Sequence, residues 1–302
     1  MRGPHNIFRL IRTGATFERT GAMNVILNAY QAPVGLRLAA KILGWPFQWL
    51  GYKGDPAMPP VTRALTALGP AYIKFGQILS TRPDVVGDEL AVQLRVLQDK
   101  LPPFPIEEAQ KMIEAELERP LASMFQDFSA PVAAASIAQV HRAKLASDGA
   151  DVAVKVLRPG IERAFRRDID AFYFAARMVE VLAPGARRLR PLDVIAHFEG
   201  VVLGELDLRL ESSAAGEFAA NTESDEGFQL PQINWSLSGK NVMTMDWAEG
   251  VSAGDNAALD AAGHDRRRIG ERILQLFLSH ALRDGFFHAD LHQGNIKIAA
   301  NG

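Results

Sequence analysis

The sequence predicts an α+β fold in which helical segments precede a β-rich lobe and further helices follow it. Three observations lead to this prediction. Apolar residues recur at helical spacing before about residue 118, short β-like runs follow from Phe125, and long amphipathic helical patterns return after residue 160. The chain has 302 residues, of which 48% are hydrophobic and 23% charged, a composition that suits one large or two modest globular domains.

Residues 1–58 form a basic, apolar segment that is predicted to be helical. Residues 1–60 contain seven Lys or Arg side chains against Glu18 and Asp55, and aromatic residues cluster between positions 45 and 52. Such a segment is typical of peripheral contact with a membrane, and it is equally explained by a helix that packs on the rest of the protein with a solvated basic face. No stretch reaches the roughly 18–20 apolar residues of a spanning helix, so any membrane contact is expected to be peripheral.

The charge and the residue types exclude several classes of protein. A net charge of −2 argues against nucleic acid or another polyanion as a partner of the whole chain. The absence of cysteine excludes disulfides, thiolate zinc sites and cysteine nucleophiles. The first 20 residues lack the apolar core and cleavage site of a secretory signal peptide, and a cytoplasmic location is expected.

Residues 59–122 are predicted to form a helical extension. Helices are predicted at about residues 60–80, 84–98 and 106–118. The dipeptide Gly69-Pro70 predicts a kink in the first of these helices, and Pro120 bounds the third.

Residues 123–250 are predicted to form the β-rich lobe, and residues 251–302 to begin a helical lobe. Strand-like runs are predicted within residues 125–146, 152–156 and 228–247, and helices at about residues 161–183, 192–220 and 266–283. Asp148-Gly149 lies between two strand-like runs and predicts a hairpin turn.

The most specific motif is His-Ala-Asp-Leu-His-Gln-Gly-Asn at residues 288–295. An Asp five residues before an Asn is the spacing of a phosphoryl-transfer catalytic loop, in which Asp290 orients the attacking hydroxyl and Asn295 offers an oxygen to Mg²⁺. The competing interpretation is a surface loop that happens to be rich in His and Asp. The preceding Phe286-Phe287 favours the first interpretation, because it resembles a buried anchor.

Val-Ala-Val-Lys at residues 152–155 predicts a strand whose Lys155 grips the phosphates of a nucleotide. Such a lysine needs a carboxylate partner, and the predicted helix over 192–220 offers Glu205, Asp207 and Glu211. Glu211 is the predicted partner of Lys155, with Asp207 on the same helix face. The alternative is a solvated acidic face. The long separation implies that a helical hairpin is inserted at about residues 161–200.

The small residues Ala133, Ala134, Ala135 and Ser136, with Ile137, stand where a glycine-rich phosphate loop belongs. A purely structural interpretation makes them a small-residue turn. The position directly before the Lys155 strand favours a loop that covers a nucleotide. The elements together form the plan of a protein-kinase-like fold, with a β-rich N-lobe, a partial helical C-lobe and an N-terminal helical extension, and they favour a nucleotide-dependent phosphotransferase.

The chain resembles the UbiB family of atypical kinases, which act in ubiquinone biosynthesis. The resemblance covers about residues 60–302 and rests on five motifs that occur in the family's order. These motifs are Lys74-Phe-Gly-Gln77, the Ala-rich loop with Gln139-Val-His141, the Lys155 strand, Glu205-Leu-Asp207 and the 288–295 loop.

The resemblance implies roles for further residues and ligands. Lys74 and Gln77 would lie near Glu205 and Asp207 and gate the cleft, and the backbone of Asp246 and Ala248 would meet adenine. The implied cofactors are ATP or ADP with Mg²⁺. The implied partners are prenylated phenol or quinone lipids and quinone-biosynthesis proteins, with a location peripheral to the inner membrane. ATP hydrolysis, rather than phosphorylation of proteins, is the implied activity.

The sequence departs from the family pattern at Gln293, where Pro is common, and at Ala138, where Gly is common. No Asp-Phe-Gly follows the 288–295 loop before Gly302. The expectation is therefore a fragment or truncated gene product that turns over poorly by itself.

Two other functions stay open on the sequence. One is a small-molecule kinase of the aminoglycoside or choline type, which would lack the Lys74–Gln77 motif and would transfer phosphate to soluble alcohols. The other is a non-catalytic, nucleotide-binding scaffold for a lipid-linked biosynthetic complex, which would tolerate an Asp290→Asn substitution.

Overall fold

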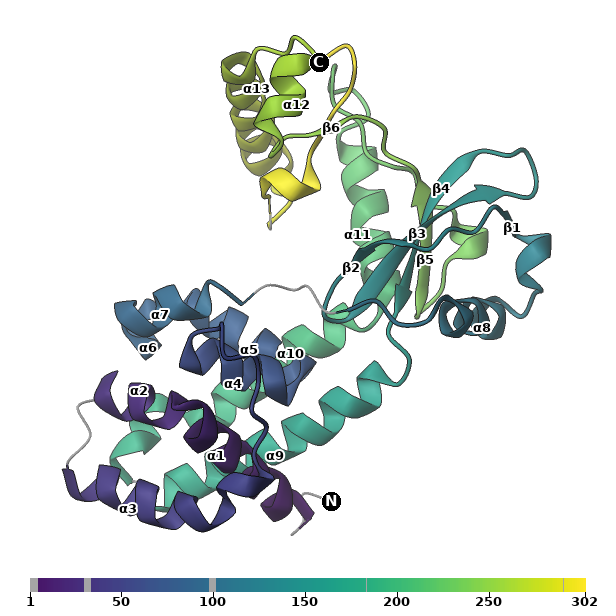
Figure 1. Cartoon of the computed structure of the whole chain (residues 1–302). Helices are drawn as coiled ribbons and strands as arrows, with labels where there is room; N and C mark the ends of the chain where they lie inside the picture. Colours follow the sequence, from purple (N-terminus) through teal and green to yellow (C-terminus); the bar gives the residue numbers. More distant parts are fainter. Residues whose placement is uncertain (1–4, 30–33, 98–101, 183, 290) are drawn as a thin grey trace. The chain divides into compact units, whose positions relative to one another are not determined.

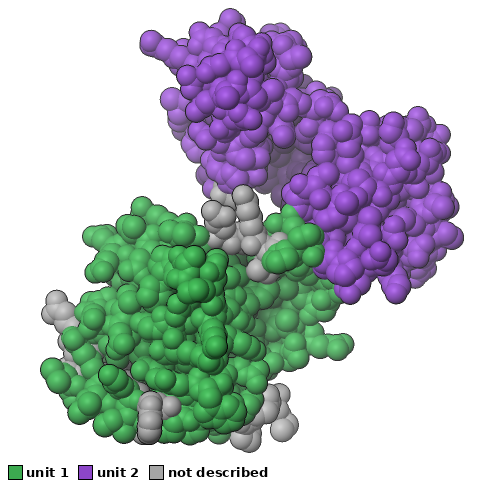
Figure 2. All heavy atoms as spheres, in the orientation of Figure 1, with its two compact units in different colours: residues 1–103, 134–138, 158–206 green, residues 104–133, 139–157, 207–302 purple. Residues whose placement is uncertain are grey.

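The computed structural model describes residues 5–29, 34–97, 102–182, 184–289 and 291–302. The predicted α+β class is confirmed (Figure 1). The chain forms two compact units, each assembled from three separate segments (Figure 2). Unit 1 contains residues 1–103, 134–138 and 158–206, and unit 2 contains residues 104–133, 139–157 and 207–302.

Unit 1 is helical. Its elements are α1 (His5–Thr20), α2 (Ala22–Ala29), α3 (Val34–Gly44), the 3₁₀-helix η1 (Trp45–Leu50), α4 (Pro60–Leu68), α5 (Pro70–Ser80), α6 (Pro83–Val86), α7 (Asp88–Leu94), α9 (Ile161–Leu182), the 3₁₀-helix η3 (Pro184–Leu189) and α10 (Pro191–Glu205). Within the part of the chain that the structure describes, no helix has both the length and the apolarity to cross a membrane.

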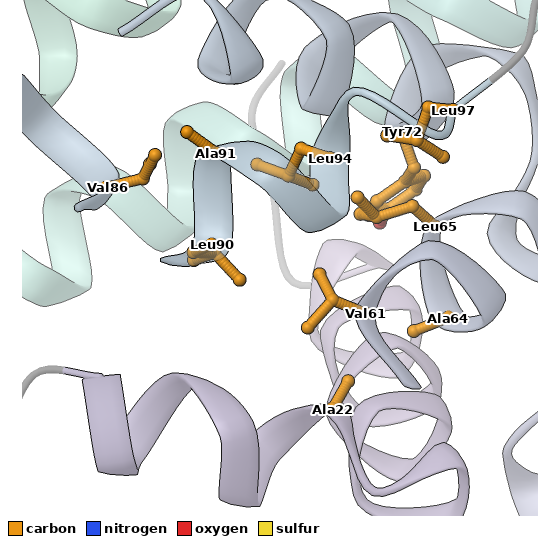
Figure 3. Packing of buried hydrophobic residues seen from close by; sticks show 10 residues of the cluster. All are labelled: Ala22, Val61, Ala64, Leu65, Tyr72, Val86, Leu90, Ala91, Leu94 and Leu97. Carbon is orange, nitrogen blue, oxygen red and sulfur yellow. The ribbon is translucent and has the colours of Figure 1, made fainter. Parts of the chain in front are cut away.

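The core of unit 1 lies between α2, α4, α5 and α7. Figure 3 shows ten of its buried side chains, among them Leu65, Tyr72 and Leu94. The helix predicted over residues 60–80 is two helices, because Gly69 adopts φ 112° and separates them. Pro70 then occupies the first turn of α5, where its missing N–H costs no hydrogen bond.

The predicted helical insertion belongs to unit 1. Its two helices, α9 and α10, pack together and contribute Phe172 and Phe198, whose rings lie 5.3 and 5.2 Å from the ring of Phe75 in α5. The prediction of a single helix over residues 192–220 is wrong. The chain leaves α10 at Glu205 and starts a new helix after Asp207.

Unit 2 contains a five-stranded sheet, as the strand-like runs predicted. Its strands are β1 (Phe125–Gln126), β2 (Pro131–Ala134), β3 (Ala138–Leu145), β4 (Asp151–Leu157) and β5 (Val242–Asp246), in the order β1-β3-β4-β5 with β2 also paired to β3. The β3–β4 connection turns at Gly149, which has φ 77°. Only residues 242–246 of the predicted 228–247 run form a strand, and Ile233 adds an isolated bridge to β5.

One face of the sheet is covered by α8 (Ile106–Leu117). Val152, Val154 and Val156 of β4 share a buried cluster with Ala109 and Ile113 of this helix. The helix α8 therefore belongs with the sheet in unit 2, although it was predicted to be part of the 59–122 extension. The four-segment division drawn from the sequence stays a prediction.

The last part of unit 2 is mainly helical. It contains β6 (Val251–Ser252), α12 (Asn256–Ala261), α13 (Arg266–Ser279), the π-helical turn η5 (His280–Asp284), the 3₁₀-turn η6 (Gln293–Asn295) and β7 (Lys297–Ile298). The strands β6 and β7 pair antiparallel, and Ala253, Leu259 and Ile298 form a small core of their own.

Candidate functional site

The centre of the candidate site is an ion pair between Lys155 and Glu211. Nζ of Lys155 donates to both carboxylate oxygens of Glu211, at 2.6 and 2.8 Å. The lysine side chain is 23% exposed and the glutamate side chain 47% exposed, so solvent reaches both members of the pair. The structure thus joins the two residues that the sequence analysis paired across 56 positions.

Alternation along β4 explains why the lysine reaches this helix. Val152, Val154 and Val156 point toward α8, so Ala153 and Lys155 point to the opposite face of the sheet. The helix α11 (Leu208–Asn221) carries Glu211 in its first turn, and α11 and β5 are in contact.

Asp207 begins α11 as its N-cap. Its carboxylate accepts a hydrogen bond from the N–H of Arg209 and pairs with the guanidinium of the same residue at 2.6 Å. This pairing holds the pKa of Asp207 below its usual range. The prediction that Asp207 and Glu211 share a helix face is wrong, because Asp207 has extended backbone angles outside the helix.

Lys74 and Glu205 form a second ion pair, at 2.7 Å between Nζ and Oε1, within unit 1. The resemblance to the UbiB family implied that Lys74 lies near Glu205. Gln77 donates from Nε2 to the carbonyl oxygen of Leu97 at 3.4 Å, and Asp207 is engaged by Arg209. The gating role of these four residues stays a prediction.

The Ala-rich loop is a tight turn between β2 and β3. Ala133 and Ala134 end β2, the N–H of Ala135 donates to the carbonyl of Ala138, and Ser136 is buried. Arg158 holds this turn from the end of β4. Its guanidinium donates to the carbonyl of Ala135 at 2.9 and 3.1 Å, and its N–H donates to the carbonyl of Ile137 at 2.8 Å. Burial lowers the pKa of Arg158.

The predicted adenine-contacting segment follows the last strand of the sheet. Asp246 ends β5, and its N–H donates to the carbonyl of Gln232 while its carboxylate accepts from the N–H of Gln232. The backbone N–H of Trp247 donates to the backbone carbonyl of Asp151. Ala248 lies in the connection that leads to β6.

Asp290 lies outside the residues that the structure describes. Asn295 ends η6, and its N–H donates to the carbonyl of His292, whose Nδ1 accepts from the N–H of Gly294. Among the described residues, no three His, Asp or Glu side chains gather closely enough to hold a metal. The donor chemistry of Asn295 fits a hard cation held mainly by phosphate oxygens, because Mg²⁺ commonly binds through few protein ligands.

Two groups of residues near the predicted motifs are not among the site residues predicted from the sequence. Arg158 holds the Ala-rich loop, and Asp225 binds His280 and Arg283 beyond the end of α11. A signal for the second group exists in the sequence, since His280 and Arg283 are three residues apart on a predicted helix.

A β-sheet with a strand lysine paired to a helix glutamate, followed by helices and a His-Ala-Asp loop, defines a protein-kinase-like class of protein. The comparison with family models agrees: the model described as ABC1 atypical kinase-like domain matches residues 96–302. The chain belongs to this family.

Several curated relatives bear the name "Probable protein kinase UbiB". The relative from Shewanella baltica (strain OS185) is 39% identical over 299 residues, which cover 99% of this chain and 53% of the relative. The relative from Marinobacter nauticus is 42% identical over 236 residues, covering 78% of this chain and 43% of the relative. One from Vibrio cholerae (strain M66-2) is 42% identical over 239 residues, covering 79% and 44%. The chain spans about half the length of the curated relatives it matches.

Proposed function

We propose that this chain binds ATP or ADP together with Mg²⁺, and that it serves an atypical kinase or ATPase which supports ubiquinone biosynthesis. The single observation that carries the proposal is the Lys155–Glu211 pair in a chain of the ABC1 family. The two oxygen contacts hold the partly exposed ammonium group on the face of β4 opposite α8, where it would meet phosphate oxygens.

The proposal gives each site residue one task. Lys155 binds the α- and β-phosphates, and Glu211 holds its ammonium in place. The Ala133–Ile137 turn covers the nucleotide, while Asp290 orients the acceptor hydroxyl or water. Asn295 would hold the Mg²⁺, which when bound neutralises charge on the phosphates.

We also propose that unit 1 contacts an anionic membrane, where prenylated phenol or quinone lipids would be partners. The support is a row of exposed apolar side chains on α3, namely Val34 (80% exposed), Leu38 (57%) and Ile42 (61%). Lys41 lies on the same helix, and Trp49 of η1 is 74% exposed. An apolar row with neighbouring cations matches an interfacial helix.

A binding experiment tests the nucleotide site. Fluorescent N-methylanthraniloyl-ADP is titrated into the chain with Mg²⁺ present, and Lys155→Ala is expected to weaken binding at least about tenfold, or about 1.4 kcal/mol. Lys144→Ala is the matched control, because Lys144 is an exposed lysine on the neighbouring strand β3. If the parent and the Lys155→Ala protein bind the nucleotide with equal affinity, the proposal is wrong.

A second measurement separates the competing functions. Transfer of labelled γ-phosphate to choline or an aminoglycoside, with no response to prenylated phenols, would favour a soluble-alcohol kinase. Unchanged quinone synthesis in cells that carry Asp290→Asn would favour a non-catalytic scaffold.

A further inference from the structure

A partly buried polar cluster joins the end of α11 to the end of α13. The carboxylate of Asp225 accepts from Nε2 of His280 at 2.9 Å and from both terminal nitrogens of Arg283, at 2.6 and 2.9 Å. The His280 side chain is 4% exposed and that of Asp225 is 10% exposed. Asp284 binds the outer side of the same guanidinium. All of these residues lie in unit 2.

The chemistry of the cluster is fixed by Asp225. An ionised carboxylate only accepts hydrogen bonds, so Nε2 of His280 must carry a proton in this contact. The guanidinium of Arg283 presents two parallel donors, which makes the contact directional. Asp225 is itself held to the end of α11, because its N–H donates to the carbonyl of Thr222, the C-cap residue of the helix.

Aromatic contacts reinforce the same junction. Phe218 of α11 packs edge-on against His280, with ring centroids 5.0 Å apart, and lies 5.9 Å from Phe286. Phe286 precedes the His288–Asn295 loop by two residues. The rings therefore connect α11 to the segment that leads into the catalytic loop.

α11 links this cluster to the Lys155 pair. Glu211 and Phe218 are seven residues apart on one helix, a rise of about 10 Å. One end of α11 thus holds the phosphate-binding lysine, and the other end holds the base of the 288–295 loop. The π-helical turn at His280–Asp284 brings both His280 and Arg283 to Asp225, and such turns are frequent at functional sites.

We infer that Asp225, His280 and Arg283 are positioning residues that fix the 288–295 loop relative to the Lys155–Glu211 pair. This inference rests on the proposed nucleotide site. The three side chains act through α11 and the loop, and Asp225 is the central acceptor because it binds both of the other two.

The first test measures the position of the loop directly. The chain has no cysteine, so thiol-reactive spin labels attach only at cysteines that are introduced. Two exposed positions are chosen for them, Ser213→Cys on α11 and Gln293→Cys in the loop. Pulsed electron–electron double resonance is expected to give a narrow distribution of distances between the two labels in the labelled parent and a clearly broadened one in the Asp225→Asn variant. The control Arg267→Gln breaks an exposed ion pair with Glu271 on α13 and should keep the distribution narrow.

Arg283→Gln provides a milder second variant, because Arg283 is 45% exposed and its loss leaves the Asp225–His280 contact in place. Circular dichroism verifies that each variant is folded, and if Asp225→Asn fails to fold, Arg283→Gln decides. A distribution as narrow as that of the parent in the folded variant overturns the inference.

The second test measures nucleotide binding on the unlabelled chain. In the parent, Mg²⁺ is expected to strengthen binding of N-methylanthraniloyl-ADP, and Asp225→Asn should remove most of that gain, by about fivefold or more. Binding without Mg²⁺, which depends on Lys155, should stay within about twofold of the parent value. A purely structural defect would weaken both equally and would count against the inference. If the parent itself binds no nucleotide, the proposed function fails, while the distance measurement still decides the positioning role.

Discussion

Gly51 lies directly against the backbone of α1. A Cβ atom at this position would meet the carbonyl group of Ala15 and the amide nitrogen of Thr16, which are backbone atoms that cannot move aside. We expect Gly51→Ala to destabilise the protein by about 1–3 kcal/mol through overpacking, since its own backbone angles suit any residue. The free energy of unfolding in urea measures the effect.

Gly14, which lies within α1 itself, provides the control. A Cβ atom there meets nothing within 4 Å. Gly14→Ala is expected to stabilise the protein by up to about 1 kcal/mol, because alanine favours the interior of a helix. Equal effects of the two substitutions would contradict this account of the α1–η1 contact.

Asp225 gives the protein a predictable response to acid. Hydrogen bonds from Arg283, and then from His280, hold its pKa at about 2. An unfolded Asp has a pKa of about 3.9, so the native state keeps the charge where the unfolded state has bound a proton. This stability is fully present above about pH 4 and is lost as the pH falls toward 2.

The difference in urea midpoint between the parent and Asp225→Asn is therefore expected to shrink as the pH falls from 4 to 2. An Asn residue has no charge to lose, so the variant lacks this part of the acid response. A difference that stays constant over the same range would show that the ion cluster does not cause it.

At the scale of elements, α11 depends on Asp207, the N-cap residue that precedes it. Asp207→Ala removes the side-chain cap on the N–H of Arg209 and is expected to cost about 1 kcal/mol in the free energy of unfolding. Asp207→Asn is the control, because asparagine caps a helix about as well as aspartate. If alanine and asparagine variants are equally stable, the cap contributes nothing.

The exposed face of α3 supplies a test of the proposed membrane contact. Burial of one large apolar side chain in a membrane is worth about 1.5–3 kcal/mol, so the double substitution Leu38→Glu, Ile42→Glu should reduce binding at least tenfold. Sedimentation with vesicles of phosphatidylethanolamine and phosphatidylglycerol measures it. Trp235→Glu, which alters an apolar residue of unit 2 that is 59% exposed, should bind like the parent. Equal sedimentation of the double variant and the parent would exclude this face.

For the whole molecule, residues with a fixed chemical role were predictable and their tertiary surroundings were not. Lys155 and Glu211 could be paired because a phosphate-binding lysine requires a carboxylate and few were available in the right segment. The five-stranded sheet was predictable from alternation and turn residues. The helix α8 could not be assigned to the sheet from the sequence, because periodicity indicates which face of a helix is apolar and not which surface covers that face.

Two features of the candidate site had no readable local signal. Asp207 in a helical pattern looks like any exposed acid, and only the backbone angles reveal it as a cap. The spacing of His280 and Arg283 places these two side chains on one helix face, but Asp225 itself is 55 and 58 residues away from them, and nothing near it in the sequence marks it as their partner. The Lys155–Glu211 pair is equally distant in the chain, but the phosphate-binding role of the lysine called for a carboxylate, whereas no such role called for a partner of Asp225.

The interleaved segments of the two units have a consequence for synthesis on the ribosome. Unit 1 takes its final segment from residues 158–206, after parts of unit 2 have already been made. Neither unit can therefore be cloned as an uninterrupted stretch of the gene. A protease that cuts one crossover leaves the halves tethered by the others, and a nascent chain must emerge beyond residue 206 before the first unit can close.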